Sequence, residues 1–269
     1  MPAVFHKTAR MLTAWSESGK VYLTDRLVRM GAKALKPPNE QEPKLRILHA
    51  ATTLFSQKGY DATGVNEIAK AAQVNKALIY YYFENKGAIL DSLIHSLMSS
   101  IYEITISFAN DCLGTMTKDG SLVIEEDRFL FVNHKAMEDF TAKLHRYYKE
   151  VVDYTLDNRA IVRILLFESL KGVKHESSLF RFMELMEKRL DDPLYRTVQI
   201  GQPNFNYHEA TVFYEFFFSI IPLVGIAAYY DEYQAKSHLS DERLRELALQ
   251  SYMAHAQMNN VQKFFVAES

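Results

Sequence analysis

The stretch GYDATGVNEIAKAAQVNKALIYYYFENKGAIL, residues 59–90, decides the fold of this chain. It contains two short helical segments, VNEIAKAAQ and NKALIYYYF, which are joined by a tight turn whose Val74 is expected to reach the core. Thr63 is expected to cap the first segment and Asn75 the second, because short polar side chains accept hydrogen bonds from the free N–H groups of a helix start. With the apolar helix that precedes it, the stretch predicts a helix-turn-helix over residues 43–90.

In a helix-turn-helix the second helix enters the major groove with its N-terminus first, so its early residues meet the base edges. Lys76 suits the N7 and O6 acceptors of guanine, and Ala77 is small enough to let the backbone approach or to touch a thymine methyl. Three consecutive tyrosines cannot all face one core, which favours DNA contact for at least one over the alternative that they only pack. Lys86 and the amide groups of the next helix start, capped by Asn85, predict a phosphate contact. The candidate DNA-binding residues are Thr63, Asn75, Lys76, Ala77, Tyr80, Tyr81, Tyr82 and Lys86.

About 50 residues around this stretch resemble the signature of the tetracycline-repressor (TetR) family. The matching positions, in order and spacing, are Gly59–Tyr60, Thr63, Ile68–Ala69, Val74, Lys76, Ile79–Tyr80, Phe83, Lys86 and Leu90. Ala77 stands where the family usually has Gly, Ala72 is interpreted as replacing the usual turn Gly, and Tyr82 replaces a frequent His. The resemblance implies an all-helical ligand-binding domain, a homodimer built on the last two long helices, and a palindromic operator.

The rest of the chain is consistent with an all-α protein. It has 48% hydrophobic residues with only 10 Gly and 7 Pro, which is typical of a globular protein. Residues 1–95 carry 13 Lys and Arg against 8 Asp and Glu, so a basic part precedes an acidic one, as expected of a DNA reader joined to another domain. A single cysteine, Cys112, and no apolar leader indicate a reducing, cytoplasmic setting.

Three regions are expected. Residues 1–42 form an extension that ends in the linker KPPNEQEP and is a mobile segment, a separate docking helix or an arm that reaches DNA. Residues 43–90 form the DNA-binding domain, and residues 91–269 form a domain for ligand binding and dimerisation. Helices are predicted near 86–113, 125–156, 158–172, 176–190, 208–235 and 240–265.

The segment from Val212 to Tyr230 has Glu215 as its only charged residue, and it contains Pro222 and Gly225. Its uncharged part is shorter than the roughly 20 residues that a bilayer requires, so core or dimer interface is favoured over a membrane span.

The C-terminal region is rich in Phe, Tyr and Met, which permits an apolar or aromatic small-molecule effector. The candidate ligand-binding residues are Tyr147, Phe167, Phe182, Met186 and Phe213. Scattered histidines without metal-ligand spacing, and the absence of GxSxG, GxxxxGK[ST] and GxGxxG, predict no metal, no cofactor and no catalytic residues. The leading hypothesis is a repressor released from its operator by the effector. The alternatives are an adaptor regulated by a protein partner, an enzyme on a helical scaffold, and an activator.

Overall fold

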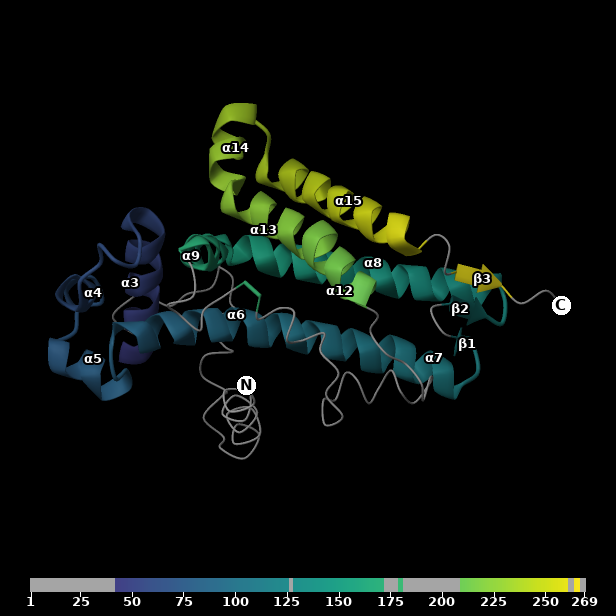
Figure 1. Ribbon diagram of the computed structural model, residues 1–269, viewed down its shortest axis with the longest axis horizontal. Coiled ribbons are helices and arrows are strands. Elements are labelled where there is room, and N and C mark those ends of the chain that lie inside the picture. The colour runs from purple at the N-terminus through teal and green to yellow at the C-terminus, as the bar shows by residue number, and fades with distance from the viewer. Residues whose placement is uncertain (1–41, 126–127, 172–178, 181–208, 261–263, 267–269) are drawn as a thin grey trace.

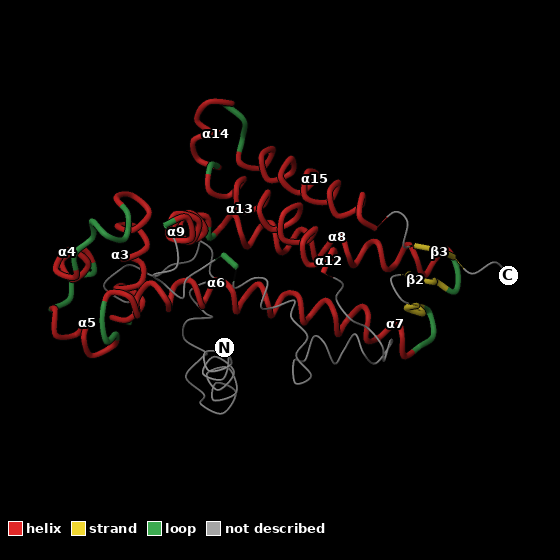
Figure 2. The backbone as a smooth tube through the Cα atoms, viewed as in Figure 1, coloured by secondary structure: helices red, strands yellow, loops and turns green. Residues whose placement is uncertain are grey.

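The computed structural model describes residues 42–125, 128–171, 179–180, 209–260 and 264–266, and most of them are helical (Figure 1). The predicted all-α fold class is confirmed, with one small sheet in addition. Figure 2 shows that the strands are confined to the end of the molecule opposite the helix-turn-helix. Residues 1–41 and most of the helix predicted at 176–190 lie outside the described residues.

Three helices form the N-terminal unit: α3 (Pro43–Lys58), α4 (Val65–Ala71) and α5 (Lys76–Tyr82). Pro43 lies in the first turn of α3, where no intrahelical N–H bond is lost, and the chain leaves α3 at Gly59 with φ 85°. The three helices bury apolar side chains that belong to a core continuous with the rest of the molecule; those of this unit include Ile47, Leu48, Ala51, Phe55, Ile68, Ala69, Ile79 and Phe83.

A long helix, α6 (Lys86–Phe108), leads from this unit into the rest of the molecule. It continues through a π-helical turn, η2 (Ala109–Gly114), into the short α7 (Thr115–Lys118). The helix predicted at 86–113 is therefore observed with a change of winding near its end. Helices α8 (His134–Asp157) and α9 (Arg159–Leu170) follow, and α6 packs against both of them.

The helix predicted at 208–235 is four segments rather than one: α12 (Glu209–Tyr214), the π-helical η3 (Glu215–Ile220), α13 (Ile221–Ala228) and α14 (Tyr230–Ser237). Pro222 has no N–H to donate, and its ring crowds the carbonyl four residues earlier, which lies in η3. The chain bends by 62° before α14. Across the described residues, no single helix is long and apolar enough to span a membrane, although the bent pair Val212–Ala228 and Tyr230–Ser237 passes by length and composition.

A three-stranded sheet was not predicted. Strand β1 (Leu122–Glu125) pairs antiparallel with β2 (Arg128–Phe131), which pairs in parallel with β3 (Phe264–Val266). The prediction of helix from residue 125 is wrong, because Asn133 caps α8 by accepting a hydrogen bond from the Ala136 N–H at 2.9 Å. The sheet covers a second small core, made of Cys112, Met116, Leu122, Ile124, Phe131, Ala136 and Phe140.

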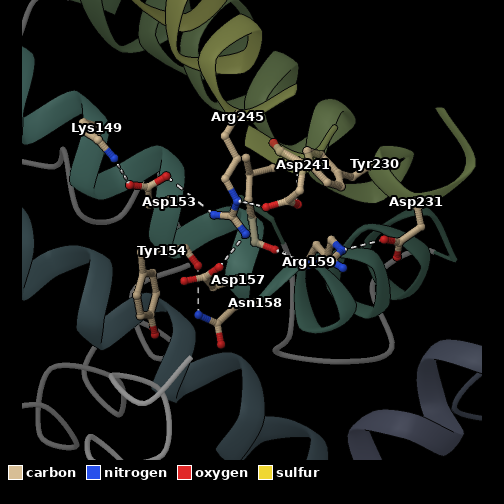
Figure 3. A network of polar contacts seen from close by, with 11 residues as sticks. Lys149, Asp153, Tyr154, Asp157, Asn158, Arg159, Tyr230, Asp231, Asp241 and Arg245 are labelled. Atoms are coloured by element: carbon tan, nitrogen blue, oxygen red, sulfur yellow. Dashed lines mark hydrogen bonds and ion pairs between the residues drawn. The ribbon is translucent and has the colours of Figure 1, made fainter. Parts of the chain in front are cut away.

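The last helix, α15 (Asp241–Asn260), packs along α8 and is tied to it by Arg245 (Figure 3). The Arg245 guanidinium lies 2.7 Å from Asp157 and 3.5 Å from Asp153 on α8, and 2.8 Å from Asp241 on its own helix. The Tyr230 hydroxyl donates to Asp241 Oδ1 at 3.0 Å, so the same cluster also holds the start of α14. This network fixes the C-terminal helices on α8 as one body.

Candidate DNA-binding site

The reading helix is α5. The Leu78 N–H donates to Asn75 Oδ1 at 2.8 Å, which confirms Asn75 as the cap of α5. Ile79 and Phe83 are buried and hold one side of the helix to α3 and α4. The opposite side of α5 is therefore presented outward in a fixed orientation.

The outward side of α5 carries most of the candidate residues. Lys76 and Ala77 are exposed in its first turn. Tyr80 is 49% exposed and Tyr81 is 79% exposed. The Lys76 ammonium lies 5.8 Å from the centre of the Tyr80 ring, so the charge and this ring form one continuous surface.

Tyr82 differs from its two neighbours. It is half-buried and packs against the core, while its ring meets that of Tyr81 edge-on at 5.0 Å. Of the three tyrosines, two thus face outward and one supports the helix.

The turn between α4 and α5 contains a left-handed residue at a position the sequence analysis did not identify. Gln73 has φ 54°, whereas Ala72 is buried with an ordinary right-handed conformation. The turn glycine of the family is therefore replaced by Gln73, and its assignment to Ala72 is wrong. The Gln73 carbonyl accepts a hydrogen bond from Arg46 Nη1 on α3 at 3.3 Å, a contact across 27 residues that no local pattern signals.

Thr63 does not cap α4. The N-cap is Gly64, whose N–H donates to Glu67 Oε2 at 2.8 Å. The Thr63 hydroxyl instead donates to the Gly59 carbonyl at 2.8 Å, and Thr63 is only 1% exposed. Its side chain therefore closes the turn after α3 and is not presented to DNA.

Lys86 is turned inward as well. Its ammonium donates to the carbonyls of Tyr60 at 2.8 Å and Thr63 at 3.0 Å, and it lies 4.2 Å from the centre of the Tyr60 ring. This internal clamp ties the start of α6 to the turn after α3 and occupies the ammonium that was predicted to contact a phosphate. Asn85 does cap α6, since the Ala88 N–H donates to its Oδ1 at 3.0 Å.

The candidate ligand-binding residues do not form one group. Tyr147 lies between helices, where its ring stacks on Phe108 with centres 4.6 Å apart and its hydroxyl is 3.3 Å from Thr105 Oγ1. Burial raises the pKa of the Tyr147 phenol. Phe167 and Phe213 are each more than half exposed. Phe182 and Met186 lie outside the described residues.

Tyr148 and Tyr252 extend the aromatic group around Tyr147 and were not among the candidates. Tyr148 meets the Tyr147 ring at 5.3 Å and the Tyr252 ring at 5.4 Å. Burial raises the pKa of Tyr148 to a value far above the ordinary one for a phenol. The group joins α6, α8 and α15, which lie far apart in the chain, so the sequence offers no signal for it.

Comparison with known proteins identifies the N-terminal unit. Residues 47–93 match the model of the family described as bacterial regulatory proteins, tetR family. The chain is 34% identical over 124 residues to the HTH-type transcriptional regulator YttP of Bacillus subtilis, a match that covers 45% of this chain and 55% of YttP. It is 43% identical over 51 residues to the negative transcriptional regulator IcaR of the biofilm operon icaADBC in Staphylococcus aureus, which covers 19% of this chain and 27% of IcaR.

The matches thus span about half or less of these relatives. A crystal structure of a TetR-family transcriptional regulator from Bordetella parapertussis aligns over 78% of this chain and 93% of its own, with 16% identity and a TM-score of 0.44. The family model covers α4 and α5 completely, together with most of α3 and the start of α6. The N-terminal unit of this chain is therefore similar to the DNA-binding part of bacterial regulatory proteins of the tetR family.

Proposed function

We propose that this protein is a transcriptional repressor that binds a palindromic operator as a homodimer and is released when a small molecule binds its C-terminal domain. The observation that carries the proposal is the outward side of α5, where Lys76, Ala77, Tyr80 and Tyr81 are exposed on a capped and rigidly held helix. A helix of this kind enters the major groove with its first turn against the bases.

Each exposed residue has a physical role in this arrangement. Lys76 donates to the N7 or O6 of guanine, and Ala77 lets the helix come close to the groove floor. Tyr80 and Tyr81 place hydroxyls at phosphates and flat rings against the sugars. Asn75 keeps its side chain on the Leu78 N–H and thereby sets where the helix begins.

A second copy of the chain is the partner that we propose for the exposed aromatic side chains of α12 and η3. Phe213 and Phe217 lie with ring centres 4.8 Å apart, and Tyr214 and Phe218 lie 5.7 Å apart. All four are about half exposed, and contiguous exposed apolar groups of this kind mark protein interfaces. To bind a palindromic operator, such a dimer must present its two reading helices to half-sites about one DNA turn, roughly 34 Å, apart.

The effector is proposed to bind beside the aromatic group formed by Phe108, Tyr147, Tyr148 and Tyr252. Stacked rings with a few hydroxyls recognise an apolar or aromatic molecule with a polar group. In this division residues 43–90 bind DNA, and residues 91–269 bind the effector and the second subunit. Repression, as opposed to activation, is proposed by analogy with IcaR, which is named a negative regulator. The proposed location is the cytoplasm, where a bacterial operator lies.

The DNA-binding part is tested by selecting genomic fragments with the purified full-length protein and measuring their affinity at several salt concentrations. A palindromic consensus is expected, and the double variant Lys76→Ala/Tyr80→Ala is expected to lose most of the preference for it. Tyr82→Phe is the matched control, because Tyr82 supports the helix from its inner side. Fragments enriched equally by the wild type and the double variant would contradict the proposal.

Dimerisation is tested by sedimentation velocity. Phe217→Asp is expected to give a monomer, whereas Val123→Asp, at an equally exposed position on β1, is expected to leave the dimer intact. Release by an effector is tested by adding apolar and aromatic compounds to the operator complex. If every compound that binds the protein leaves operator affinity unchanged, the allosteric part is wrong.

A further inference from the structure

An ion pair connects the reading unit, made of α3, α4 and α5, to the C-terminal body, which runs from α6 to α15. Lys171, the residue that ends α9, donates from its ammonium to Asp61 Oδ2 at 2.8 Å. Asp61 lies in the turn between α3 and α4, 110 residues earlier in the chain. Figure 1 shows α9 beside α3, and these two helices pack against each other.

The Lys171 ammonium is also bound within the C-terminal body itself. It also donates to Glu168 Oε1 at 2.7 Å, and the Glu168 side chain is only 2% exposed. Glu168 Oε2 is buried and has no hydrogen-bond partner in the part of the chain that the structure describes. A buried carboxylate strongly requires a cation, so Lys171 stays on Glu168 whatever the reading unit does.

On the other side, Asp61 is part of a rigid turn. The Lys86 ammonium binds the carbonyls of Tyr60 and Thr63 on either side of it, and the Thr63 hydroxyl closes the turn on Gly59. The turn leads directly into α4. A displacement of the Asp61 carboxylate therefore moves the whole helix-turn-helix, because the turn that carries Asp61 is rigid.

We propose that Lys171 and Asp61 are positioning residues, which set the angle of the reading unit on the C-terminal body and so select the half-site spacing of the operator. The apolar contact between α3 and α9 holds the two parts together but is not directional. The ion pair adds direction, because its two ends are fixed to different parts. This inference rests on the proposed function in its reference to an operator, but the angle itself is a property of the free protein.

The informative variant is Asp61→Ala. It removes the ion pair between the two parts, leaves Glu168 paired with Lys171, and affects an exposed residue. Lys171→Met is unsuitable because it leaves a buried carboxylate without its cation. Glu84→Ala is the matched control, since it removes one exposed carboxylate from the same unit, in the turn between α5 and α6.

The first measurement is the distance between the reading unit and the body in the free protein. Spin labels at Ala71→Cys on α4 and Ala142→Cys on α8, both exposed positions, are introduced with Cys112→Ala because Cys112 is the single cysteine. Labelled protein is diluted into unlabelled protein so that the distance within one chain is measured. Asp61→Ala is expected to broaden the distance distribution while it lowers the melting temperature by no more than about 3 °C, whereas Glu84→Ala and Lys171→Arg keep the wild-type distribution.

The second measurement is operator affinity as a function of half-site spacing, with the central spacer changed by one base pair in either direction. An ion pair between side chains this exposed changes an equilibrium constant by about threefold per protomer, and so by about tenfold per dimer. Asp61→Ala is expected to reduce the discrimination between spacings by about that factor.

The two measurements separate the possible failures. If Asp61→Ala has the distance distribution and spacing preference of the wild type, the positioning role is overturned. If the wild-type protein binds no operator but the distribution broadens in Asp61→Ala, the proposed function fails while the geometric role stands.

Discussion

Lys86→Met is expected to reduce the free energy of unfolding by about 3 kcal/mol, because it removes two charge-assisted hydrogen bonds of about 1.5 kcal/mol each. These are the bonds from the Lys86 ammonium to the carbonyls of Tyr60 and Thr63. The cation–π contact with the Tyr60 ring adds about 0.5–1 kcal/mol. A positive charge in the first turn of α6 costs about the same through the helix dipole, so these two effects cancel. Methionine keeps the apolar stem, and the loss therefore reports on the ammonium.

The assay is urea denaturation followed by far-UV circular dichroism, combined with operator binding at several salt concentrations. Lys76→Met is the control, because Lys76 is exposed on α5. It is expected to change stability by less than about 0.5 kcal/mol and to weaken operator binding, because Lys76 is proposed to contact guanine. If Lys86→Met instead keeps the wild-type stability and reduces the slope of log affinity against log salt, Lys86 binds phosphate and the clamp is the wrong interpretation.

Three further predictions concern stability. Gln73→Gly is expected to stabilise the protein by about 0.5–1 kcal/mol in thermal unfolding, because φ 54° strains any residue with a Cβ; a Gln73→Ala variant as stable as Gln73→Gly would contradict this. Asn75→Ala is expected to cost about 1 kcal/mol through the lost cap of α5, and an unchanged urea midpoint would exclude that role. Arg245 holds the pKa of Asp241 below its ordinary value of 3.8 by hydrogen bonding, so this ionised carboxylate stabilises the fold above that value, and the stability is lost as the pH falls through the lower pKa of the folded state. Arg243→Met is the control, because Arg243 pairs with Glu246 on an exposed face. Compared with this control, Arg245→Met is expected to have a smaller free energy of unfolding at pH 7 and to lose less of it on acidification to about pH 3. Equal losses of unfolding free energy in the two variants would show that Arg245 does not cause the pKa shift of Asp241.

The local pattern determined the helix-turn-helix. Helical spacing of apolar residues and the caps Asn75 and Asn85 follow from interactions within a few residues. Such interactions are visible in the sequence because the partners are neighbours in the chain.

Contacts between distant residues decided the rest. A lysine in the first turn of a helix has the same local pattern whether it binds phosphate or internal carbonyls, and only the approach of the turn after α3 assigns Lys86 to the clamp. Likewise, the hydroxyl of Thr63 has a helix start and a carbonyl within reach, and the folded turn selects the carbonyl. The small sheet required β3, from the far end of the chain, to lie beside β2.

The sequence by itself therefore determined the helix-turn-helix and the residue, Asn75, that caps its second helix. Only the tertiary structure decided which polar side chains remain available to DNA, because a hydrogen-bonding group turns inward or outward according to the partners that the folded chain brings within about 3 Å of it. The same holds for the Lys171–Asp61 contact, which joins residues 110 positions apart and has no local signature.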